Sequence, residues 1–293
     1  MIAPRSFLFV PGDSERKMAK ACAGAAHALV LDLEDSVAAE RLAAARQSVR
    51  EFLLAQRDRS RQQLWVRINP LDGDKALDDL AQVMAGAPDG VLLPKCLGAA
   101  EIQRLDHYLS ALERREGLAA GSTRIVAVAT ETAAAMFGLG SYRGASARLA
   151  GLTWGAEDLA AAVGASTNKA DDGSYGFVFQ LARNLCLLGA RAAGVPAIDS
   201  VLPDFRAAGA LRAEVRRARQ DGFTAKFAIH PDQVEAINAG FAPDEREIAH
   251  ARAVVEAFRQ APHAGTLQVD GKMVDKPHLT QALQILGAAG QGG

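Results

Sequence analysis

The chain lacks several features that would assign it to a specialised class of protein. Its three cysteines, Cys22, Cys96 and Cys186, are widely separated and do not have the spacing of a metal site. Isolated thiols in a chain of 293 residues favour reduced, packed side chains over disulfides. No apolar run approaches the roughly 20 residues that a membrane helix requires, and the N-terminus does not have the pattern of a signal peptide. These absences predict a cytoplasmic protein without a membrane partner.

An excess of charge of one sign is also absent. The 33 Lys and Arg residues nearly balance the 34 Asp and Glu residues, so the formal net charge is −1. A chain without a global basic field is not expected to bind nucleic acid. A local basic patch for a phosphorylated cofactor stays open. Arg5 and Lys20, which flank the first apolar run, are candidates to bind phosphates, with solvated surface as the alternative reading of each.

Short apolar runs, each followed by a polar residue and a helix-like segment, recur along the chain. Their ranges are 7–10, 28–33, 64–68, 90–93, 124–129, 149–154, 196–201 and 226–229. Buried parallel strands read as continuous apolar runs rather than as alternating patterns. The alternation of strand and helix leaves no gap for a second domain, and it predicts a (β/α)₈ TIM barrel over residues 1–242.

A C-terminal helical extension is predicted beyond the barrel, over residues 243–286. It comprises a helix at 244–260, a short extended piece at 266–274 and a final helix after Pro277. An amphipathic segment outside a finished barrel has to cover apolar surface, and we expect a neighbouring subunit to provide that surface. The glycine-rich residues 287–293 are expected to be disordered.

The candidate functional residues follow from the architecture, because barrel enzymes place their chemistry at the carboxyl ends of the strands. Acid and base side chains are more numerous there than a structural rim requires. These side chains are Asp32, Glu34, Asp35, Arg67, Lys95, Glu131, Asp158, Asp199 and His230.

Glu131 and Asp158 are the candidate metal ligands. They follow neighbouring predicted strands, which in a sheet lie about 4.8 Å apart, so the two carboxylates can converge on one ion. Carboxylate oxygens without a nearby His or Cys cluster suit Mg²⁺ rather than Zn²⁺. The alternative is that both acids only cap the helices that follow them. Thr130 is available to do the capping beside Glu131, which favours the metal site.

Three basic side chains at strand ends each allow two interpretations. Arg67 ends an interior strand, where an unpaired guanidinium would be costly. It therefore binds either a substrate carboxylate in fork geometry or, internally, Asp32 or Glu34. Lys95 pairs with acids or with substrate, and Schiff-base chemistry is its lesser alternative. His230 is either structural or faces the substrate.

Glu34 and Asp35 are candidates for a supporting or catalytic role beside the metal. They are placed to bind metal-bound waters or to hold Arg67 and Lys95, and Asp32 and Lys95 are expected to support the site in the same way. The alternative is that one of the two acids caps the helix expected near Val37.

Several segments together resemble the CitE-like branch of the HpcH/HpaI aldolase superfamily, which contains citrate lyase β subunits, malyl-CoA lyases and citramalyl-CoA lyases. The resemblance covers about residues 4–285 and is carried by RSFLFVPGDSERKMAKA, VLDLEDSV, VRINP, LLPK, ATETAAAMFGL, WGAEDLAAAVGA and FAIHPDQVEAIN. It implies a (β/α)₈ barrel, Mg²⁺ ligands at Glu131 and Asp158, and a carboxylate-binding arginine at Arg67, with Glu131 also close to the substrate.

The C-terminal segment DGKMVDKPH resembles a segment that reaches a neighbour's active site in acyl-CoA lyases. This places a candidate catalytic proton-transfer group at Asp275 and implies a homotrimer or hexamer, with coenzyme A as the thioester carrier. One departure is Thr224–Ala225, where the family usually has a Gly before the Lys. Another is the polar loop 165–175, which is expected to be mobile and to influence the choice of substrate.

The resemblance implies a Mg²⁺-dependent carbon–carbon lyase that cleaves a 3-hydroxyacyl-CoA of the citramalyl-CoA or malyl-CoA type to acetyl-CoA and a 2-oxo acid. Two alternatives within the superfamily are a citrate lyase β subunit, whose citryl group is held by an acyl carrier protein, and a CoA-free 2-oxo-acid aldolase. A non-catalytic assembly subunit is a fourth reading. The acyl-CoA-lyase-like tail disfavours the CoA-free aldolase, and Arg67, Glu131 and Asp158 disfavour the non-catalytic subunit.

Overall fold

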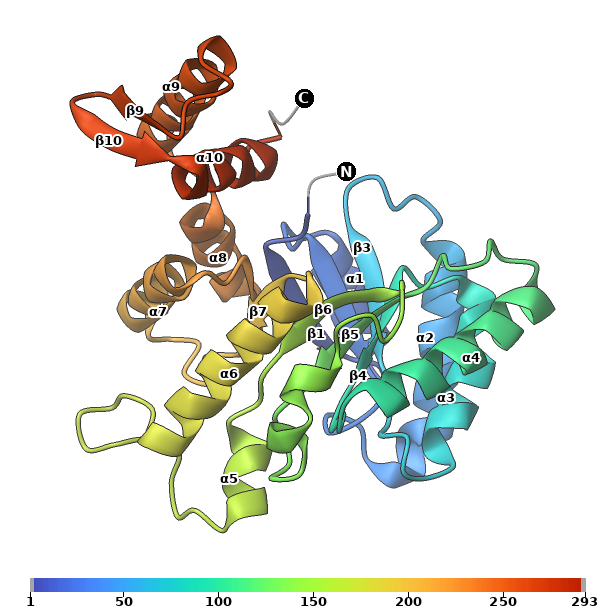
Figure 1. Cartoon of the computed structure of the whole chain (residues 1–293). Coiled ribbons are helices and arrows are strands. Elements are labelled where there is room, and N and C mark those ends of the chain that lie inside the picture. The colour runs from blue at the N-terminus through green and yellow to red at the C-terminus, as the bar shows by residue number, and fades with distance from the viewer. Residues whose placement is uncertain (1–2, 291–293) are drawn as a thin grey trace. The chain divides into compact units, whose positions relative to one another are not determined.

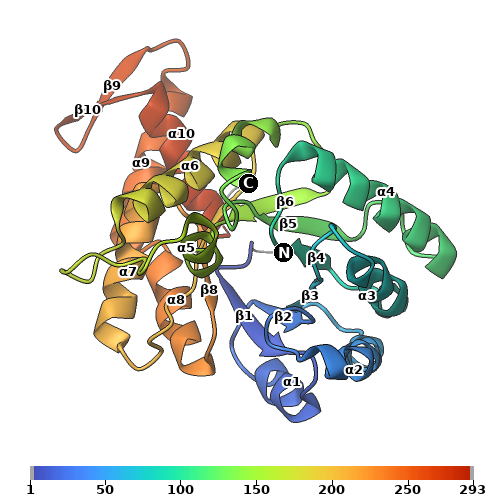
Figure 2. The ribbon, with the colours of Figure 1, turned by 90° about the horizontal axis from the view of Figure 1, so that it is seen from below.

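The predicted strands form a closed parallel barrel in chain order, in a computed structural model that describes residues 3–290 (Figures 1 and 2). The fold class predicted from the sequence is confirmed. The strands are β1 Ser6–Pro11, β2 Ala28–Asp32, β3 Gln63–Arg67, β4 Gly90–Leu93, β5 Arg124–Val128, β6 Leu149–Thr153, β7 Ala197–Asp199 and β8 Ala225–Ala228. The barrel belongs to a compact unit that spans Pro4–Gly240, and a second unit begins at Phe241.

Helices connect the strands on the outside of the barrel. They are α1 Glu15–Cys22, α2 Leu42–Ala55, α3 Lys75–Val83, α4 Ala99–Glu116, α5 Glu157–Val163, α6 Phe177–Ala193, α7 Ala208–Asp221 and α8 Val234–Phe241. Figure 2 shows α1 to α4 outside the first strands. Two 3₁₀ turns, Ala135–Phe137 and Leu139–Ser141, stand between β5 and β6 in place of a long helix. None of the helices in the described part of the chain is both long and apolar enough to cross a membrane.

Large side chains fill the barrel interior, because inward-facing positions alternate along each strand. Phe7 packs edge-on against Trp65 at 5.9 Å between ring centroids and lies 5.3 Å from Phe227. Phe9 stacks on Phe227 at 5.0 Å, and the guanidinium of Arg67 lies 4.9 Å above the Phe9 ring. The interior is therefore a packed core, and the site chemistry is confined to the carboxyl end above it.

A buried ion cluster around Arg148 joins α4 to the start of β6 at the amino end of the barrel. Arg148 immediately precedes β6, and its guanidinium holds Glu113 of α4 through two bonds of 2.6 and 2.7 Å. Asp106 accepts the Nε hydrogen of the same arginine at 2.5 Å. Backbone N–H groups of Gly121 and Thr123 also donate to Glu113. Nearly every polar atom of the cluster thus has a partner.

The C-terminal unit has its own core, described here by itself. It contains α9 Glu245–Gln260, β9 Thr266–Val269, β10 Lys272–Asp275 and α10 Lys276–Ala288. Phe258 and Val274 are among the buried side chains of its core. The single extended piece expected over 266–274 is a two-stranded antiparallel hairpin, because Asp270 and Gly271 take positive φ angles of 50° and 77° and turn the chain.

The end of α10 overlaps the tail that was expected to be disordered. Helix α10 ends at Ala288 and therefore includes the first two residues of the segment 287–293. Residues 291–293 lie outside the described residues.

Candidate active site

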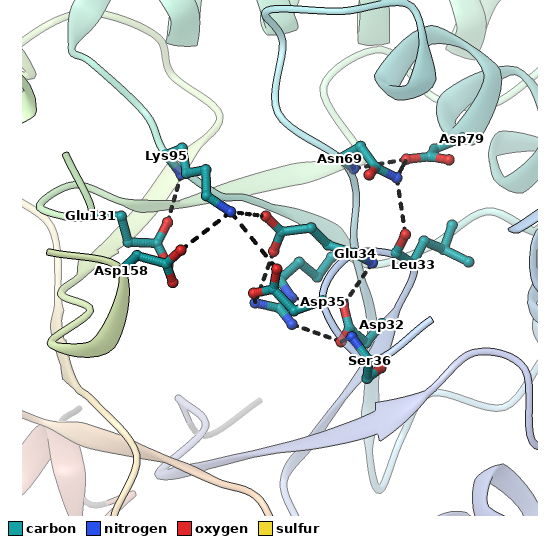
Figure 3. Close-up of polar contacts among 11 residues, drawn as sticks. Asp32, Leu33, Glu34, Asp35, Ser36, Asn69, Asp79, Lys95, Glu131 and Asp158 are labelled. Carbon is teal, nitrogen blue, oxygen red and sulfur yellow. Dashed lines mark hydrogen bonds and ion pairs between the residues drawn. The ribbon is translucent and has the colours of Figure 1, made fainter. Parts of the chain in front are cut away.

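Charged side chains from several strand ends meet at the carboxyl end of the barrel (Figure 3). They lie at the ends of β2 and β3, in the turns that follow β2, β4 and β5, and in the first turn of α5. The structure brings together Asp32, Glu34, Asp35, Arg67, Lys95, Glu131 and Asp158.

Arg67 is held rigidly by Asp32. The two residues are register partners on β2 and β3, and the Nε and Nη2 groups of Arg67 each donate to Asp32 at 2.7 Å. Burial opposes ionisation of both side chains. The pairing outweighs it, lowering the pKa of Asp32 and raising that of Arg67. The internal ion pair that the sequence left open is therefore present, and it fixes the guanidinium plane.

Asp32 also shapes the turn that carries Glu34 and Asp35. Its carboxylate accepts the backbone N–H of Glu34 at 3.0 Å and of Ser36 at 3.2 Å. The N–H of Val37 bonds to the backbone oxygen of Glu34, so neither acid caps the following segment with its side chain. The capping alternative for these two acids is not what the structure shows. Their carboxylates point toward the basic residues instead (Figure 3).

Glu34 is a buried acid between two cations. Its Oε1 lies 2.5 Å from Lys95 Nζ, and its Oε2 lies 2.9 Å from Arg67 Nη1 at angles that do not make a hydrogen bond. Burial raises the pKa of Glu34 to about 7, although Arg67 and Lys95 both act to lower it. A carboxyl group that titrates near neutral pH is suited to accept and return a proton.

Lys95 bridges the two sides of the site through its backbone and its side chain. It has a positive φ of 52°, which is uncommon for a residue with a Cβ. Its N–H donates to Glu131 at 2.6 Å, while Nζ contacts Glu34 and lies 3.5 Å from Asp158 (Figure 3). Burial lowers the pKa of Lys95, but the surrounding carboxylates outweigh this and raise it, so the ammonium is charged.

Glu131 is almost fully buried, with 6% of its surface exposed. Burial, together with the negative charges of Asp158 and Glu34, raises its pKa to about 8. Oε2 accepts the N–H of Lys95, whereas Oε1 accepts no hydrogen bond from any residue in the range 3–290. Gly155 lies against this carboxylate, where an added Cβ would come within 2.8 Å of the Glu131 Cγ. Gly155 thus leaves room for the Glu131 side chain, and Oε1 is available for a ligand.

Neither Glu131 nor Asp158 caps a helix. The hydroxyl of Thr132 accepts the N–H of Ala135 in the turn after β5, and Thr130, expected to cap this turn, instead accepts the N–H of Gly155 at 3.1 Å. Helix α5 begins without a side-chain cap. Asp158 lies in its first turn, where its carboxylate faces Lys95 (Figure 3).

The site fits a divalent cation. Five carboxylates face two cationic side chains, which leaves three negative charges uncompensated when all are ionised. Within residues 3–290, no group of three or more His, Cys, Asp or Glu residues could hold a metal ion on its own. Two carboxylates with the remaining positions open suit Mg²⁺, which keeps several waters or substrate oxygens among its ligands.

Four residues singled out in the sequence lie apart from this cluster. Arg5 precedes β1 at the amino end of the barrel, and Lys20 is in the last turn of α1, which runs back toward that end. Asp199 pairs with Lys226 of β8 and with Arg183 of α6. His230 caps the turn after β8 by accepting the N–H of Asp232 at 3.2 Å, which is the structural alternative left open for it.

Asp275 lies in the C-terminal unit as the N-cap of α10. Its carboxylate accepts the N–H of His278 and lies 2.5 Å from the His278 ring nitrogen Nδ1. The hydrogen bond with His278 lowers the pKa of Asp275, so the carboxylate form is favoured.

Asn69 and Asp79 are site-supporting residues that the sequence did not reveal. Asn69 donates its side-chain N–H to the backbone oxygen of Leu33 at 2.9 Å and to the fully buried Asp79 at 2.8 Å (Figure 3). The turn that carries Glu34 is thus tied to the end of β3. The Asn69–Pro70 pair that follows the predicted strand 64–68 signals a strand end, but nothing in it reveals these partners.

Known proteins are similar to this chain in sequence and in fold over most of their length. The model of the HpcH/HpaI aldolase/citrate lyase family matches residues 5–231. The chain belongs to this family. The enzyme class predicted from the sequence, a lyase of the aldolase type, is confirmed. The chain is 32% identical to the citrate lyase subunit beta of Haemophilus influenzae over 290 residues, covering 98% of this chain and 97% of that protein.

A second relative and a solved structure are similarly close. The chain is 33% identical to a (3S)-malyl-CoA thioesterase of Cereibacter sphaeroides over 287 residues, covering 97% and 94% of the two chains. It also resembles the crystal structure of the protein CitE from Mycobacterium tuberculosis in complex with magnesium, acetoacetate and coenzyme A. That match has a TM-score of 0.78 and 34% identity, and covers 98% of each chain.

Proposed function

We propose that this protein is a Mg²⁺-dependent lyase that cleaves a 3-hydroxyacyl-CoA of the malyl-CoA or citramalyl-CoA type to acetyl-CoA and a 2-oxo acid. The observation that carries the proposal is the convergence of the Glu131 and Asp158 carboxyl groups, with one Glu131 oxygen unbonded among the described residues, beside the fixed guanidinium of Arg67. The CitE structure, which contains magnesium, acetoacetate and coenzyme A, supports the same ligands here.

The residues divide the work between binding and proton transfer. Glu131 and Asp158 hold Mg²⁺, and bound Mg²⁺ supplies Lewis-acid stabilisation of negative charge that develops on oxygen. Arg67, oriented by Asp32, grips the carboxylate of the hydroxy acid and contributes fixed positive charge. Lys95 keeps Glu34 close to this charge.

Proton transfer accompanies cleavage of the carbon–carbon bond. Glu34, whose pKa is about 7, accepts the proton of the substrate hydroxyl, with Asp35 beside it in the same turn. The electron pair of the cleaved bond moves to the carbon next to the thioester carbonyl and delocalises onto the carbonyl oxygen, which leaves a 2-oxo acid and a thioester enolate. The enolate then takes one proton on carbon to give acetyl-CoA, which balances the proton that Glu34 accepted from the hydroxyl. Asp275 of a neighbouring subunit is the proposed relay, taking that proton from solvent and passing it to the enolate.

Assembly into a homotrimer or hexamer is part of the proposal, since it would deliver Asp275 to a neighbour. Exposed apolar side chains on the barrel unit support an interface there: Phe137 is 95% exposed, Phe177 78% and Leu188 63%. Light scattering coupled to gel filtration tests it, and a monomer at assay concentration would contradict it. A cytoplasmic location is also proposed, supported by three cysteines that are all free.

Hydrolysis of a malyl thioester is a second candidate function, favoured by the malyl-CoA thioesterase relative. A third is cleavage of a citryl group on an acyl carrier protein partner, favoured by the citrate lyase relative. The lyase and the thioesterase reactions differ in their products. A lyase yields acetyl-CoA and a 2-oxo acid, whereas a thioesterase yields the hydroxy acid and free coenzyme A.

The test is product analysis by mass spectrometry after purified protein is offered malyl-CoA and citramalyl-CoA, with Mg²⁺ or with EDTA. We expect equal amounts of acetyl-CoA and of glyoxylate or pyruvate, formed only with Mg²⁺. Release of free coenzyme A and hydroxy acid would replace the lyase by the thioesterase. No turnover of either thioester by folded protein would leave the carrier-bound substrate as the better proposal.

A further inference from the structure

A further buried charge cluster, centred on Asp199 and Lys226, lies between the barrel strands and the surrounding helices. Asp199 on β7 and Lys226 on β8 are 3% and 2% exposed, and they pair at 2.9 Å. Their strand neighbours Ile198 and Phe227 belong to the barrel core, so Asp199 and Lys226 face outward. Arg183 of α6 also donates to Asp199, at 3.2 Å.

Asp199 has a further partner that connects the cluster to the active site. The indole N–H of Trp154 donates to Asp199 Oδ1 at 2.8 Å, and the indole ring packs edge-on against Tyr175 with centroids 5.0 Å apart. Trp154 is 2% exposed. A buried ion cluster contributes little net stability by itself. The buried charge of Asp199 is better explained by the side chain that it holds in place, that of Trp154.

Trp154 is the residue that follows β6, and Asp158 comes four positions later in the first turn of α5. The intervening turn is fixed at two successive residues. The side chain of Trp154 is held by Asp199, and the N–H of Gly155 is held by the hydroxyl of Thr130 at 3.1 Å. The path from strand to helix, and with it the place of Asp158, is therefore set by these two hydrogen bonds.

We propose that Trp154 is a positioning residue for metal binding: its indole N–H, held by the buried carboxylate of Asp199, places Asp158 beside Glu131. The inference rests on the proposed function, because it takes these two acids as the ligands of a divalent cation. Residues that orient a metal ligand typically change metal affinity by about 10- to 100-fold when they are removed. An anchor that acts through the backbone belongs at the lower end of that range.

The two tryptophans of the chain allow a matched comparison. Trp154→Phe removes the N–H donor and keeps an aromatic ring against Tyr175. Trp65→Phe likewise removes one hydrogen bond, from Trp65 Nε1 to Gln63 at 2.9 Å, within the barrel core. Isothermal titration of the full-length proteins with Mn²⁺, in the absence of any thioester, reports metal affinity independently of turnover. Thermal melting of each variant reports the stability of the fold.

We expect Trp154→Phe to weaken Mn²⁺ binding by about 10-fold and Trp65→Phe to change it by less than about twofold, at similar melting temperatures. Equal Mn²⁺ affinity of Trp154→Phe and wild type would overturn the inference and leave the proposed function intact. Equal weakening by both variants would also overturn it, because the effect would then be general destabilisation. Absence of Mn²⁺ binding by the wild type would instead overturn the metal site itself.

A second variant decides the case if Trp154→Phe does not fold. Thr130→Val keeps the shape of the buried side chain and removes the hydroxyl that holds Gly155. Weaker Mn²⁺ binding by folded Thr130→Val would support the two-anchor turn, and unchanged binding would contradict it.

Discussion

The two ends of the barrel each bury an arginine among carboxylates, yet the carboxylates respond in opposite ways. At the amino end, the pKa of Glu113 is lowered to about 2 beside Arg148. At the carboxyl end, the pKa of Glu34 is raised to about 7 and that of Glu131 to about 8, beside Arg67 and Lys95. Burial acts in the same direction in all three cases, so burial alone does not explain the difference.

The difference lies in how completely each carboxylate is hydrogen-bonded. Burial pushes the pKa of Glu113 upward, but both of its oxygens accept hydrogen bonds, from Arg148 and from the backbone of Thr123 and Gly121. Glu131 accepts one N–H, from Lys95, and has other acids for neighbours. A saturated cluster has all its charge paired within the protein, whereas an unsaturated one is prepared for a ligand that brings positive charge.

The largest effect is expected from Glu131→Gln at the unsaturated end. The variant keeps the shape of the side chain and removes the charge that holds the cation, so Mg²⁺-dependent turnover should fall by about 10³-fold, the upper range for loss of one electrostatic group. Steady-state kinetics with malyl-CoA and citramalyl-CoA would measure this, and the melting temperature of the metal-free protein should not fall. Turnover within tenfold of wild type would remove Glu131 from the metal site.

The next effect is expected from Arg148→Met at the saturated end. Removing the guanidinium leaves the buried Glu113 and the half-buried Asp106 without a cation, which should lower the free energy of unfolding by about 3 kcal/mol or more. Urea denaturation measures that change. The folded fraction should retain the kcat of wild type. A loss of stability below about 1 kcal/mol would show that the buried carboxylates do not depend on the Arg148 guanidinium.

The pH dependence of stability should have opposite signs at the two ends. Glu113 has a pKa of about 2 in the fold and an ordinary value of 4.5, so its contribution is present above pH 4.5 and is lost as the pH falls toward 2. Glu113→Gln should remove this loss. We would measure urea denaturation of wild type and variant from pH 5 downward, and parallel curves would contradict the assignment.

Glu131 shows the reverse behaviour in metal-free protein. Its pKa rises from 4.5 to about 8 on folding, so its contribution is present below pH 4.5 and is lost as the pH rises through 8. Metal-free wild type should therefore lose stability relative to Glu131→Gln between these values. The same denaturation series in EDTA measures it, and a constant difference between the two proteins would argue against a strained carboxylate.

The smallest effect is expected in the C-terminal unit, whose Asp275 is exposed to solvent. Asp275→Ala should lower kcat by about 10²-fold, the lower end of the range for loss of an acid–base group, with little change in KM. Asp275→Asn is the matched control, because Asn caps a helix about as well as Asp but cannot transfer a proton. Recovery of kcat in Asp275→Asn would reduce Asp275 to its capping role at α10.

Much of the barrel was predictable because its signals are local. Each apolar run ends within two residues of the end of a strand, so the sequence predicts Asp32 and Arg67 near neighbouring strand ends. Whether a strand residue faces the core or the helices depends on a one-residue register, and for that reason Asp199 was wrongly assigned to the site. The Asp270–Gly271 turn was a visible hairpin signal that was overlooked.

The supporting contacts were not predictable, because they join residues far apart in the sequence. Asn69 reaches the backbone of Leu33, and Trp154 reaches Asp199 across 45 positions. No local pattern marks either contact. The proposed delivery of Asp275 to the active site of a neighbouring subunit rests on resemblance alone, because no local pattern predicts it.

The central claim is that the unsaturated end of the barrel holds a divalent cation between Glu131 and Asp158. The most direct measurement is the anomalous difference density of a crystal of the protein soaked in Mn²⁺. The account predicts one strong peak within bonding distance of both carboxylates, and no peak beside Glu113 at the opposite end. A soaked crystal with no peak at Glu131 and Asp158, or with its strongest peak elsewhere, would contradict it.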